Sequence, residues 1–417
     1  MDNTGGDPGK PLVILIATGM QPYREYLLQG ISSRFRVHLF HTGEPTWERR
    51  YLASWTVVSS TLDGPAMAQR AVNLQQAHRV SGVLCWDEGR ILAAAEVASV
   101  LGLPGGDPDV VWRIRDKAQT RAALTVAGLP QPRSIPVRTQ QQALDAAELI
   151  GYPVILKPRG LGASLGVVRA DSTEQLRERF GFTRDTQAPD PVRYRTDHPI
   201  LVEELVSGEE ISLDSVIQDG VVTPLFVARK VVGYPPYAEE IGHYVCANDP
   251  LLADPGFRRL VQATHTALGL TDGFTHSEFM LSPTGPQVIE VNGRLGGDLI
   301  PYLGMLATGI EPGAVAASAA CGLNLPLRPD RRKVAGVRFS YVAEDDTTIG
   351  TIGFDARALP AGVDQAVVLV RPGAVVSPPP KGTVWGRIAY TTVVADSIAE
   401  CRDLLDDAAL ALGYQAQ

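Results

Sequence analysis

The chain has 417 residues, a length that predicts two to four domains. It is 45% hydrophobic and 20% charged, as is ordinary for a soluble globular enzyme, and its net charge is −8 with no basic block, which argues against a nucleic-acid-binding protein. No signal-peptide pattern and no membrane-spanning apolar run is found. The four cysteines lack metal-ligand or disulfide spacing, so a reducing cytoplasm fits best: Cys85, Cys246, Cys321 and Cys401.

Strands and helices alternate in the first hundred residues. LVILIA (12–17) is a continuous apolar run typical of a strand buried on both faces, and RVHLFH (36–41) and SGVLCW (81–86) read as further strands. Apolar residues at helical spacing separate them, so we expect a parallel α/β layer. No GxGxxG follows the first strand, which makes a dinucleotide site there unexpected. The Pro, Gly and Asp residues of PGGDPDV (104–110) predict a domain boundary.

A glycine-rich loop follows the next group of elements. The helix at 115–130 begins near Asp116 and Lys117, and the later strand PVILK (153–157) opens into PRGLGASLGVV (158–168), which we call the glycine loop. Glycines let backbone amides approach an anion without side-chain obstruction. The lysine precedes the glycines, unlike a Walker A loop, and a strand rather than a helix follows, unlike a Rossmann turn. A hairpin cover over phosphates and a plain hairpin turn are about equally favoured by the loop alone.

Acidic residues recur in the next strands and loops. ILVEE (200–204) and ISLDSVI (211–217) predict two strands joined by an acidic connector, which taken alone reads as a solvated hairpin. An adenine edge on the connector and a ribose on one carboxylate form the functional alternative. In the following loop Glu240 and His243 lie three residues apart and are candidates for substrate contact, although a lone histidine is more often structural.

Two carboxylates should face each other in the hairpin that follows. FTHSEFML (274–281) and VIEV (288–291) flank the turn SPTGPQ, so antiparallel pairing would place Glu278 opposite Glu290, with Asn292 next along. Glu290, Asn292 and Arg294 alternate and share one side of an extended chain. Paired carboxylates repel unless a cation lies between them, and carboxylate and amide oxygens suit Mg²⁺. An exposed acidic hairpin is less favoured, because the flanking residues are apolar.

These segments together resemble a known family. RDKAQTRAAL, PVILKPRGLGASLGVV, VEELVSGEEISLD, HSEFML and VIEVNGRLGG occur in the order found in ATP-grasp enzymes, and the resemblance covers residues 105–325 closely. VGYPPYAEEIGHYV and NGRLGGDLIPYLGMLATG place the chain nearest the carboxylate–amine ligases, close to the bacterial L-amino-acid (dipeptide) ligases. The biotin carboxylase group is similar in fold.

The resemblance implies a site for ATP. Two lysines would bind the phosphates, with Lys157 also near the adenine, while the glycine loop would close over the β- and γ-phosphates. The backbone at 204–206 would meet adenine, Glu203 would accept from its amino group, and Glu210 would hold the ribose hydroxyls. The implied nucleotide contacts are Lys117, Lys157, Gly160, Gly162, Ser164, Gly166, Glu203, Glu204, Leu205, Val206 and Glu210.

The resemblance also implies metal and substrate sites. Two magnesium ions would be bound by Glu278, Glu290 and Asn292, and Arg294 would hold the substrate carboxylate and the acyl phosphate made from it. An aspartate at position 298 casts doubt on a small apolar N-terminal substrate and suggests a cationic or hydroxylated group. The implied catalytic residues are Arg294, Lys157, Glu240 and His243, and the implied substrate contacts are Glu240, His243, His276, Arg294, Gly297 and Asp298.

The expected fold is α/β, with an α+β ATP-grasp core of two lobes. We expect a Rossmann-like N-terminal domain (1–108), a small lobe with the glycine loop (109–200), a large lobe with the magnesium and substrate site (201–325) and a small α+β C-terminal domain (326–417). The expected activity is ATP-dependent joining of an amino acid or small carboxylic acid to an amine or amino acid. A bicarbonate-activating enzyme and a non-catalytic ATP-binding regulator are the alternatives. Dimers are common among similar enzymes, so a homodimer is the assembly that the resemblance suggests.

Overall fold

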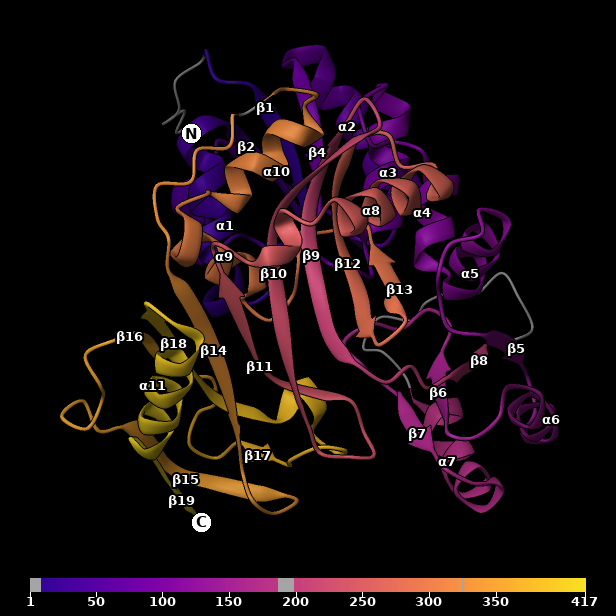
Figure 1. Ribbon diagram of the computed structural model, residues 1–417. Helices are drawn as coiled ribbons and strands as arrows, with labels where there is room; N and C mark the ends of the chain where they lie inside the picture. The colour runs from indigo at the N-terminus through magenta and orange to yellow at the C-terminus, as the bar shows by residue number, and fades with distance from the viewer. Residues whose placement is uncertain (1–8, 187–198, 325) are drawn as a thin grey trace.

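A parallel sheet forms the first layer of the molecule, with the strand order β3-β2-β1-β4 (Figure 1). The computed structural model describes residues 9–186, 199–324 and 326–417. β1 pairs in parallel with both β2 and β4, which confirms the predicted α/β layer, and every residue of β1 is buried. The elements are β1 (Leu12–Ile16), α1 (Gln21–Arg34), β2 (Arg36–His41), β3 (Ser54–Val57), α2 (Gly64–Ala77), β4 (Val80–Leu84) and α3 (Ile91–Leu101).

The strand order of this sheet reverses at β1, because the chain continues to β2 on one side and returns to β4 on the other. The loops that leave β1 and β4 therefore start side by side at the carboxyl edge of the sheet. Ligands of open α/β sheets bind at such switch points. This edge is consequently the part of the first layer that can contribute to a site.

The small lobe is a four-stranded antiparallel sheet with the order β5-β8-β6-β7. Apolar residues of two helices pack on it, and their shared core includes Leu144, Phe180 and Leu156. Two further helices connect this lobe to the first layer. The elements are α4 (Pro108–Arg115), α5 (Lys117–Val126), β5 (Ser134–Val137), α6 (Gln140–Ile150), β6 (Val154–Pro158), β7 (Val168–Ala170), α7 (Thr173–Asp185) and β8 (Ile200–Glu204).

An eight-stranded antiparallel sheet forms the centre of the molecule, in the order β13-β12-β9-β10-β11-β14-β18-β16. Neighbouring residues of β10 point to opposite faces, so Val227 packs in the core beneath α8 while Phe226 and Ala228 pack in the core beneath α9. The elements are β9 (Glu209–Gln218), β10 (Val221–Gly233), β11 (Glu239–Cys246), α8 (Pro255–Leu268), β12 (Gly273–Ser282), β13 (Gly285–Asn292), α9 (Ile300–Thr308), α10 (Pro312–Ala320), β14 (Val334–Tyr341), β16 (Val363–Val368) and β18 (Arg387–Ala395).

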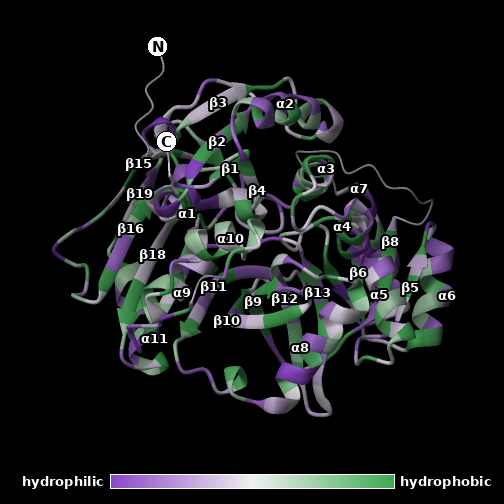
Figure 2. Cartoon of the chain, turned by 90° about the horizontal axis from the view of Figure 1, so that it is seen from above, coloured by the Kyte–Doolittle hydropathy of each residue, from purple (hydrophilic) through white to green (hydrophobic). Residues whose placement is uncertain are grey.

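The C-terminal segment contributes three strands to this central sheet, because β14 pairs with β11 and β18 pairs with both β14 and β16. The sheet therefore runs across the boundary proposed at 325/326, and the division into domains stays a proposal. The rest of the segment forms β15 (Thr347–Phe354), β17 (Val375–Val376), α11 (Ile398–Leu410) and β19 (Leu412–Ala416). Both views place β15 and β19 at the opposite end of the molecule from the small lobe (Figures 1 and 2).

Buried side chains hold the layers together. α10 packs against the first sheet, where Ala316 and Ala317 share a core with Leu27 and Leu84. Figure 2 looks down on these elements and shows the parallel strands next to α10, above the central sheet. No helix in the described ranges is long and apolar enough to cross a membrane.

Candidate active site

The glycine loop connects β6 to β7 as predicted, because Val154–Leu156 pairs antiparallel with Val168–Ala170. Within the loop, Ala163 and Ser164 have positive φ angles of 55° and 53°. Gly166 also has a positive φ of 72°, and an added Cβ would lie 2.8 Å from Pro158. The loop therefore needs a glycine at this point. Its position at the mouth of a cavity agrees with the hairpin-cover interpretation.

Lys157 ends β6 and is buried beside a carboxylate on the neighbouring strand. Its Nζ lies 2.5 Å from Glu203 Oε2, and Arg121 Nε lies 2.8 Å from Oε1 of the same carboxylate. Burial alone would raise the pKa of Glu203, but Arg121 and Lys157 hold it down at about 2. Both oxygens of Glu203 thus already face cations, and its predicted contact with adenine remains a prediction.

The predicted carboxylate hairpin is present. β12 and β13 pair antiparallel, with Glu278 opposite Glu290 and His276 opposite Asn292. The turn is shorter than the sequence suggested: Ser282 already pairs with Gly285, which leaves two residues between the strands. The sequence analysis excluded Pro286 from the second strand, but the structure includes it in β13. Proline is tolerated there because β13 is an edge strand of the sheet.

The oxygens of this hairpin form a donor set suitable for a hard cation. Lysines currently neutralise the two carboxylates: Lys117 Nζ lies 3.0 Å from Glu290 and Lys230 Nζ lies 2.9 Å from Glu278. The Asn292 amide faces Glu290 at 3.0 Å when its nitrogen is placed towards that carboxylate. Two carboxylates and an amide on adjacent strands that line one cavity fit Mg²⁺, which prefers oxygen ligands.

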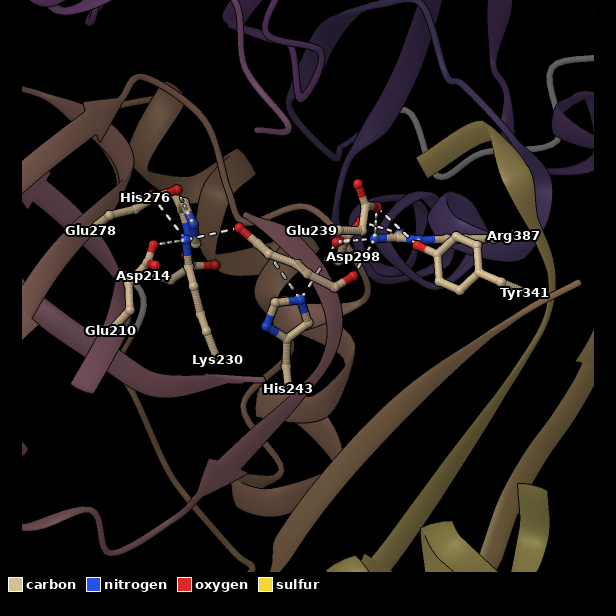
Figure 3. Close-up of polar contacts among 11 residues, drawn as sticks. Glu210, Asp214, Lys230, Glu239, His243, His276, Glu278, Asp298, Tyr341 and Arg387 are labelled. Atoms are coloured by element: carbon tan, nitrogen blue, oxygen red, sulfur yellow. Dashed lines mark hydrogen bonds and ion pairs between the residues drawn. The ribbon is translucent and has the colours of Figure 1, made fainter. Parts of the chain in front are cut away.

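Lys230 was missed by the sequence analysis and lies at the centre of the site (Figure 3). Its side chain is 1% exposed, and its Nζ contacts Glu210 at 2.7 Å and both Glu240 and Glu278 at 2.9 Å. Burial lowers the pKa of this lysine, yet the three carboxylates raise it well above its ordinary value. Lys230 therefore stays charged, and it connects the residues predicted to bind ribose, metal and substrate.

His276 lines the same cavity, yet both of its nitrogens face carboxylates. Nδ1 lies 2.6 Å from Asp214, and Nε2 lies 3.5 Å from Glu278. Burial alone would lower the pKa of His276, but Asp214 and Glu278 raise it to about 9. These contacts make His276 suited to orienting Glu278, and its predicted contact with substrate remains a prediction.

Arg294 follows β13 and meets a carboxylate from the first layer. Its Nε lies 2.8 Å from Glu88, which belongs to the loop after β4, and Arg115 lies 3.6 Å from the same carboxylate. Arg115 also donates to the carbonyl of Gly160 at 2.6 Å. The carboxyl edge of the first sheet, the glycine loop and Arg294 are thus joined by one chain of polar contacts.

Asp298 faces a cation of the protein itself, and the expected contact with a cationic or hydroxylated substrate group stays a prediction. Arg387 Nη1 and Nη2 contact the two Asp298 oxygens at 2.7 and 2.8 Å (Figure 3). The guanidinium also lies 3.6 Å from the centre of the Phe339 ring. Burial would raise the pKa of Asp298, but Arg387 holds it well below its usual range. The sequence could not show this pair, because 89 residues separate its members.

Glu240 and His243 lie on strand β11 rather than in the loop that the sequence suggested, and their side chains come together there. His243 Nε2 lies 3.3 Å from Glu240 and 3.5 Å from Asp298, and the imidazole is fully buried. These three residues could present ligand atoms to a metal, since the atoms lie within 4.8 Å of one another. We do not assign a metal there, because both oxygens of Asp298 are held by the guanidinium of Arg387, a two-point contact that Glu278 and Glu290 do not make with their lysines.

Two adjoining cavities contain these residues. The carboxylate cavity, of about 260 Å³, lies between the small lobe and the central sheet, and the arginine cavity, of about 450 Å³, lies between the first layer, the glycine loop and the C-terminal segment. Arg294, Gly297 and Asp298 line both. Of the residues predicted from the sequence, the carboxylate cavity is lined by Lys117, Lys157, Gly162, Ser164, Glu203, Glu204, Leu205, Val206, Glu210, Glu240, His276, Glu278, Glu290, Asn292, Arg294, Gly297 and Asp298.

Three predicted residues lie outside these walls. Gly160 and Gly166 belong to the glycine loop, other residues of which line the cavity, and His243 is buried beside Glu240. The sequence analysis missed Glu88, Arg115, Lys230 and Arg387. Their only local signal is a charged residue in or beside an apolar strand, as in VARKVV and SGVLCWDE.

Comparisons with known proteins agree with this geometry. Residues 150–302 match the family model described as the ATP-grasp domain. An uncharacterized protein, y4rH, of Sinorhizobium fredii is 31% identical over 327 residues, covering 76% of this chain and 64% of that protein. The alanine–anticapsin ligase of Bacillus subtilis is 28% identical over 236 residues, covering 51% of this chain and 48% of that protein. The chain therefore spans about half to two thirds of the length of these curated relatives.

A solved structure shares the fold along nearly the whole chain. The L-amino acid ligase from Bacillus licheniformis has a TM-score of 0.79, with 98% of this chain and 99% of that chain covered at 21% identity. This likeness and the domain match confirm the predicted α/β fold class with its ATP-grasp core.

Proposed function

We propose that this chain, a member of the ATP-grasp superfamily, is an ATP-dependent carboxylate–amine ligase. It would activate a carboxylate as an acyl phosphate and join it to an amine or amino acid, with release of ADP and phosphate. The observation that carries the proposal is that Arg294 lies in the wall shared by the two cavities. A nucleotide in one cavity and a carboxylate in the other would meet at this guanidinium.

The carboxylate cavity is the proposed site for ATP. Lys117 and Lys157 supply positive charge to the phosphates, and the glycine loop supplies backbone amides above them. The segment 204–206 would meet the adenine, while Glu210, held by Lys230, would accept from the ribose hydroxyls. In this arrangement the γ-phosphate would lie near Arg294.

Glu278, Glu290 and Asn292 fit the magnesium ions that the superfamily implies, and two ions remain our proposal. When bound, the ions would neutralise phosphate charge. Lys117 and Lys230 neutralise the same carboxylates and would turn towards other anions. Lys230 retains Glu210 and Glu240 as partners, so its charge stays compensated in either state.

The reaction must bring together two anions, the substrate carboxylate and the γ-phosphate. Arg294 would hold the carboxylate while a carboxylate oxygen bonds to the γ-phosphorus and ADP leaves. The amine then attacks the acyl carbon, the bond to the phosphate oxygen breaks, and the ammonium proton is lost. Glu88, which pairs with Arg294 in the wall of the arginine cavity, would keep the guanidinium in one orientation during both steps.

The glycine loop is the proposed barrier to water. An acyl phosphate hydrolyses readily, so the site must exclude solvent until the amine arrives. The loop lines both cavities through Leu161, Gly162 and Ala163. One movement of this loop could therefore open or close both sites.

A phosphate-release assay with paired substrates tests the proposal. Panels of amino acids and small carboxylic acids would be offered with amines in the presence of Mg²⁺ and ATP, followed by mass spectrometry of the product. We expect phosphate release that depends on both substrates, with an amide as the product. Bicarbonate-dependent release without an amine would instead favour a biotin-carboxylase-like enzyme, and tight ATP binding without turnover would favour a regulator.

The proposed partners are small molecules. We also propose that the enzyme is cytoplasmic and acts as a homodimer. The acidic chain has no basic block that would suggest a nucleic-acid partner.

A further inference from the structure

The charged residues of the arginine cavity are paired with one another, with one exception. Glu88 lies between Arg115 and Arg294, and Asp298 is paired with Arg387. Asp87, the remaining acid in the wall, lies 2.7 Å from Arg90. These pairs leave no carboxylate in the wall to bind a cationic substrate group without losing its present partner.

Arg24 is the exception. Its guanidinium lines the cavity and donates to the carbonyl of Gly296 at 3.4 Å, and no carboxylate of the described ranges lies within ion-pair distance of it. The residue is half-buried in the first turn of α1, the helix that follows β1. The positive end of the helix and the position at the switch point both favour an anion beside this side chain.

The contact with Gly296 places Arg24 close to the reacting centre. Gly296 lies between Arg294, which would hold the acyl group, and Asp298, which lines both cavities. A small molecule in the arginine cavity can therefore present an amine towards Arg294 while its acidic group meets Arg24. The other walls near this path are largely apolar and include Met20, Tyr23 and Trp385.

We infer that Arg24 binds a carboxylate on the amine substrate, so that the acceptor is an amino acid rather than a simple amine. The inference rests on the proposed ligase function and names the acceptor class and its anchoring residue. An acceptor side chain would lie against the apolar walls, of which Trp385 is 61% exposed at the surface. A cationic acceptor without an acidic group would meet an unneutralised guanidinium and bind poorly.

The test compares each amino acid with its carboxamide, which removes the negative charge and retains the amine. L-Alanine, L-leucine and L-phenylalanine would be measured against L-alaninamide, L-leucinamide and L-phenylalaninamide as acceptors, with the carboxylate donor found in the phosphate-release screen. We expect kcat/KM to be roughly 10- to 100-fold higher for the best free amino acid, the range of a lost charge-assisted hydrogen bond. Arg24→Ala should remove this preference, with kcat/KM for the carboxamide within about 2-fold of wild type.

Two further variants separate charge from structure. Arg24→Lys keeps the charge and should recover part of the preference, whereas Arg34→Ala removes an exposed arginine at the other end of α1 and should leave it intact. Equal use of acid and carboxamide by the wild type, or an equal loss of both in Arg24→Ala, would overturn the inference.

Binding without turnover distinguishes the two proposals. Titration of the same six compounds into protein saturated with a non-hydrolysable ATP analogue should show the carboxylate preference, and Arg24→Ala should abolish it. If the preference is seen but no substrate pair releases phosphate, the ligase proposal fails while the carboxylate subsite stands. If amide products form from amino acids and carboxamides alike, the ligase proposal stands and the subsite is wrong.

Discussion

The carboxylate cavity and the arginine cavity share a wall but are built in different ways. The first is formed mainly by strands of the small lobe and the central sheet, and its polar residues occur in short motifs such as VIEVNGR and VILKPRG. The second takes its wall from the first layer, the glycine loop, the segment after β13 and the C-terminal segment. A nucleotide site can thus be specified by local motifs, whereas the substrate site depends on how distant segments meet.

The two cavities also differ in electrostatics. In the carboxylate cavity, lysines neutralise acids that are suited to metal ions, so ligand binding must exchange one set of ion pairs for another. In the arginine cavity the acids are already paired with arginines, and Arg24 alone lacks a carboxylate among the described residues. The first arrangement would select a charged nucleotide with its metals, and the second would select one additional negative charge.

The largest expected effect comes from removing Arg294, a cation that lines both cavities. Arg294→Ala should lower kcat by about 1,000-fold, as expected for loss of a group that stabilises developing negative charge, while ATP affinity changes little. Steady-state kinetics and calorimetric titration of ATP check the two parts. Arg258→Ala, an exposed arginine of α8, is the control and should behave as wild type. Undiminished ligation in Arg294→Ala would remove the central assignment.

Lys230→Met tests whether one buried cation holds the carboxylate cavity together. Without Mg²⁺ and ATP, the variant should lose about 3–5 kcal/mol of unfolding free energy, because three carboxylates are left without their shared partner. Urea unfolding measures this, and Mg²⁺ with ATP should recover part of the loss. Lys333→Met, which removes a lysine from an exposed pair with Asp396, should cost far less. A Lys230→Met protein as stable as wild type would contradict the account.

Glu290→Gln addresses the metal ligands of the same cavity. The variant should need a higher Mg²⁺ concentration for half-maximal activity, and its kcat should fall on the order of 100-fold, because an amide is a weaker ligand than a carboxylate. A magnesium titration at saturating ATP provides the measurement. Glu209→Gln, an exposed acid at the start of β9, is the matched control. An unchanged magnesium dependence would show that the ions bind elsewhere.

Glu239, which lies 3.9 Å from Arg387, should give a smaller effect, on the pH dependence of stability. Its carboxyl accepts from the Tyr341 hydroxyl at 2.9 Å, and burial raises its pKa from 4.5 to about 7. The folded protein retains this proton at pH values where the unfolded chain releases it, so its contribution to stability falls as the pH rises from about 4.5 to 7. Relative to Glu239→Gln, the wild type should lose about 2 kcal/mol across that range. If urea unfolding gave the wild type and Glu239→Gln the same dependence of stability on pH, the raised pKa of Glu239 would be refuted.

Much of the fold could be predicted because local patterns specify it. The apolar run at 12–17 predicted a buried parallel strand, and the turn SPTGPQ predicted a hairpin that pairs Glu278 with Glu290. The length of the turn was wrong, since an edge strand tolerates proline. The participation of β14, β16 and β18 in the central sheet had no local signal, because strand pairing depends on partners far along the chain.

The residues of the candidate site that belong to local motifs were predictable, whereas the pairs between distant segments were not. Lys117, Lys157 and Glu290 belong to motifs and line one cavity, as expected. Arg387 could not be paired with Asp298 from the sequence, and the expectation about the substrate group at Asp298 stays a prediction. Lys230 received no role from the sequence, although the nearby Val227 and Ala228 are buried and a buried lysine needs acidic partners.

The account as a whole requires that an oxygen of the substrate carboxylate becomes bonded to phosphorus at Arg294. A donor acid labelled with oxygen-18 in its carboxylate tests this directly, since phosphate released during ligation can be analysed by mass spectrometry. We predict one oxygen-18 atom in each phosphate and the other in the amide product. Unlabelled phosphate, or label carried into AMP instead, would contradict the acyl phosphate and with it the proposed reaction.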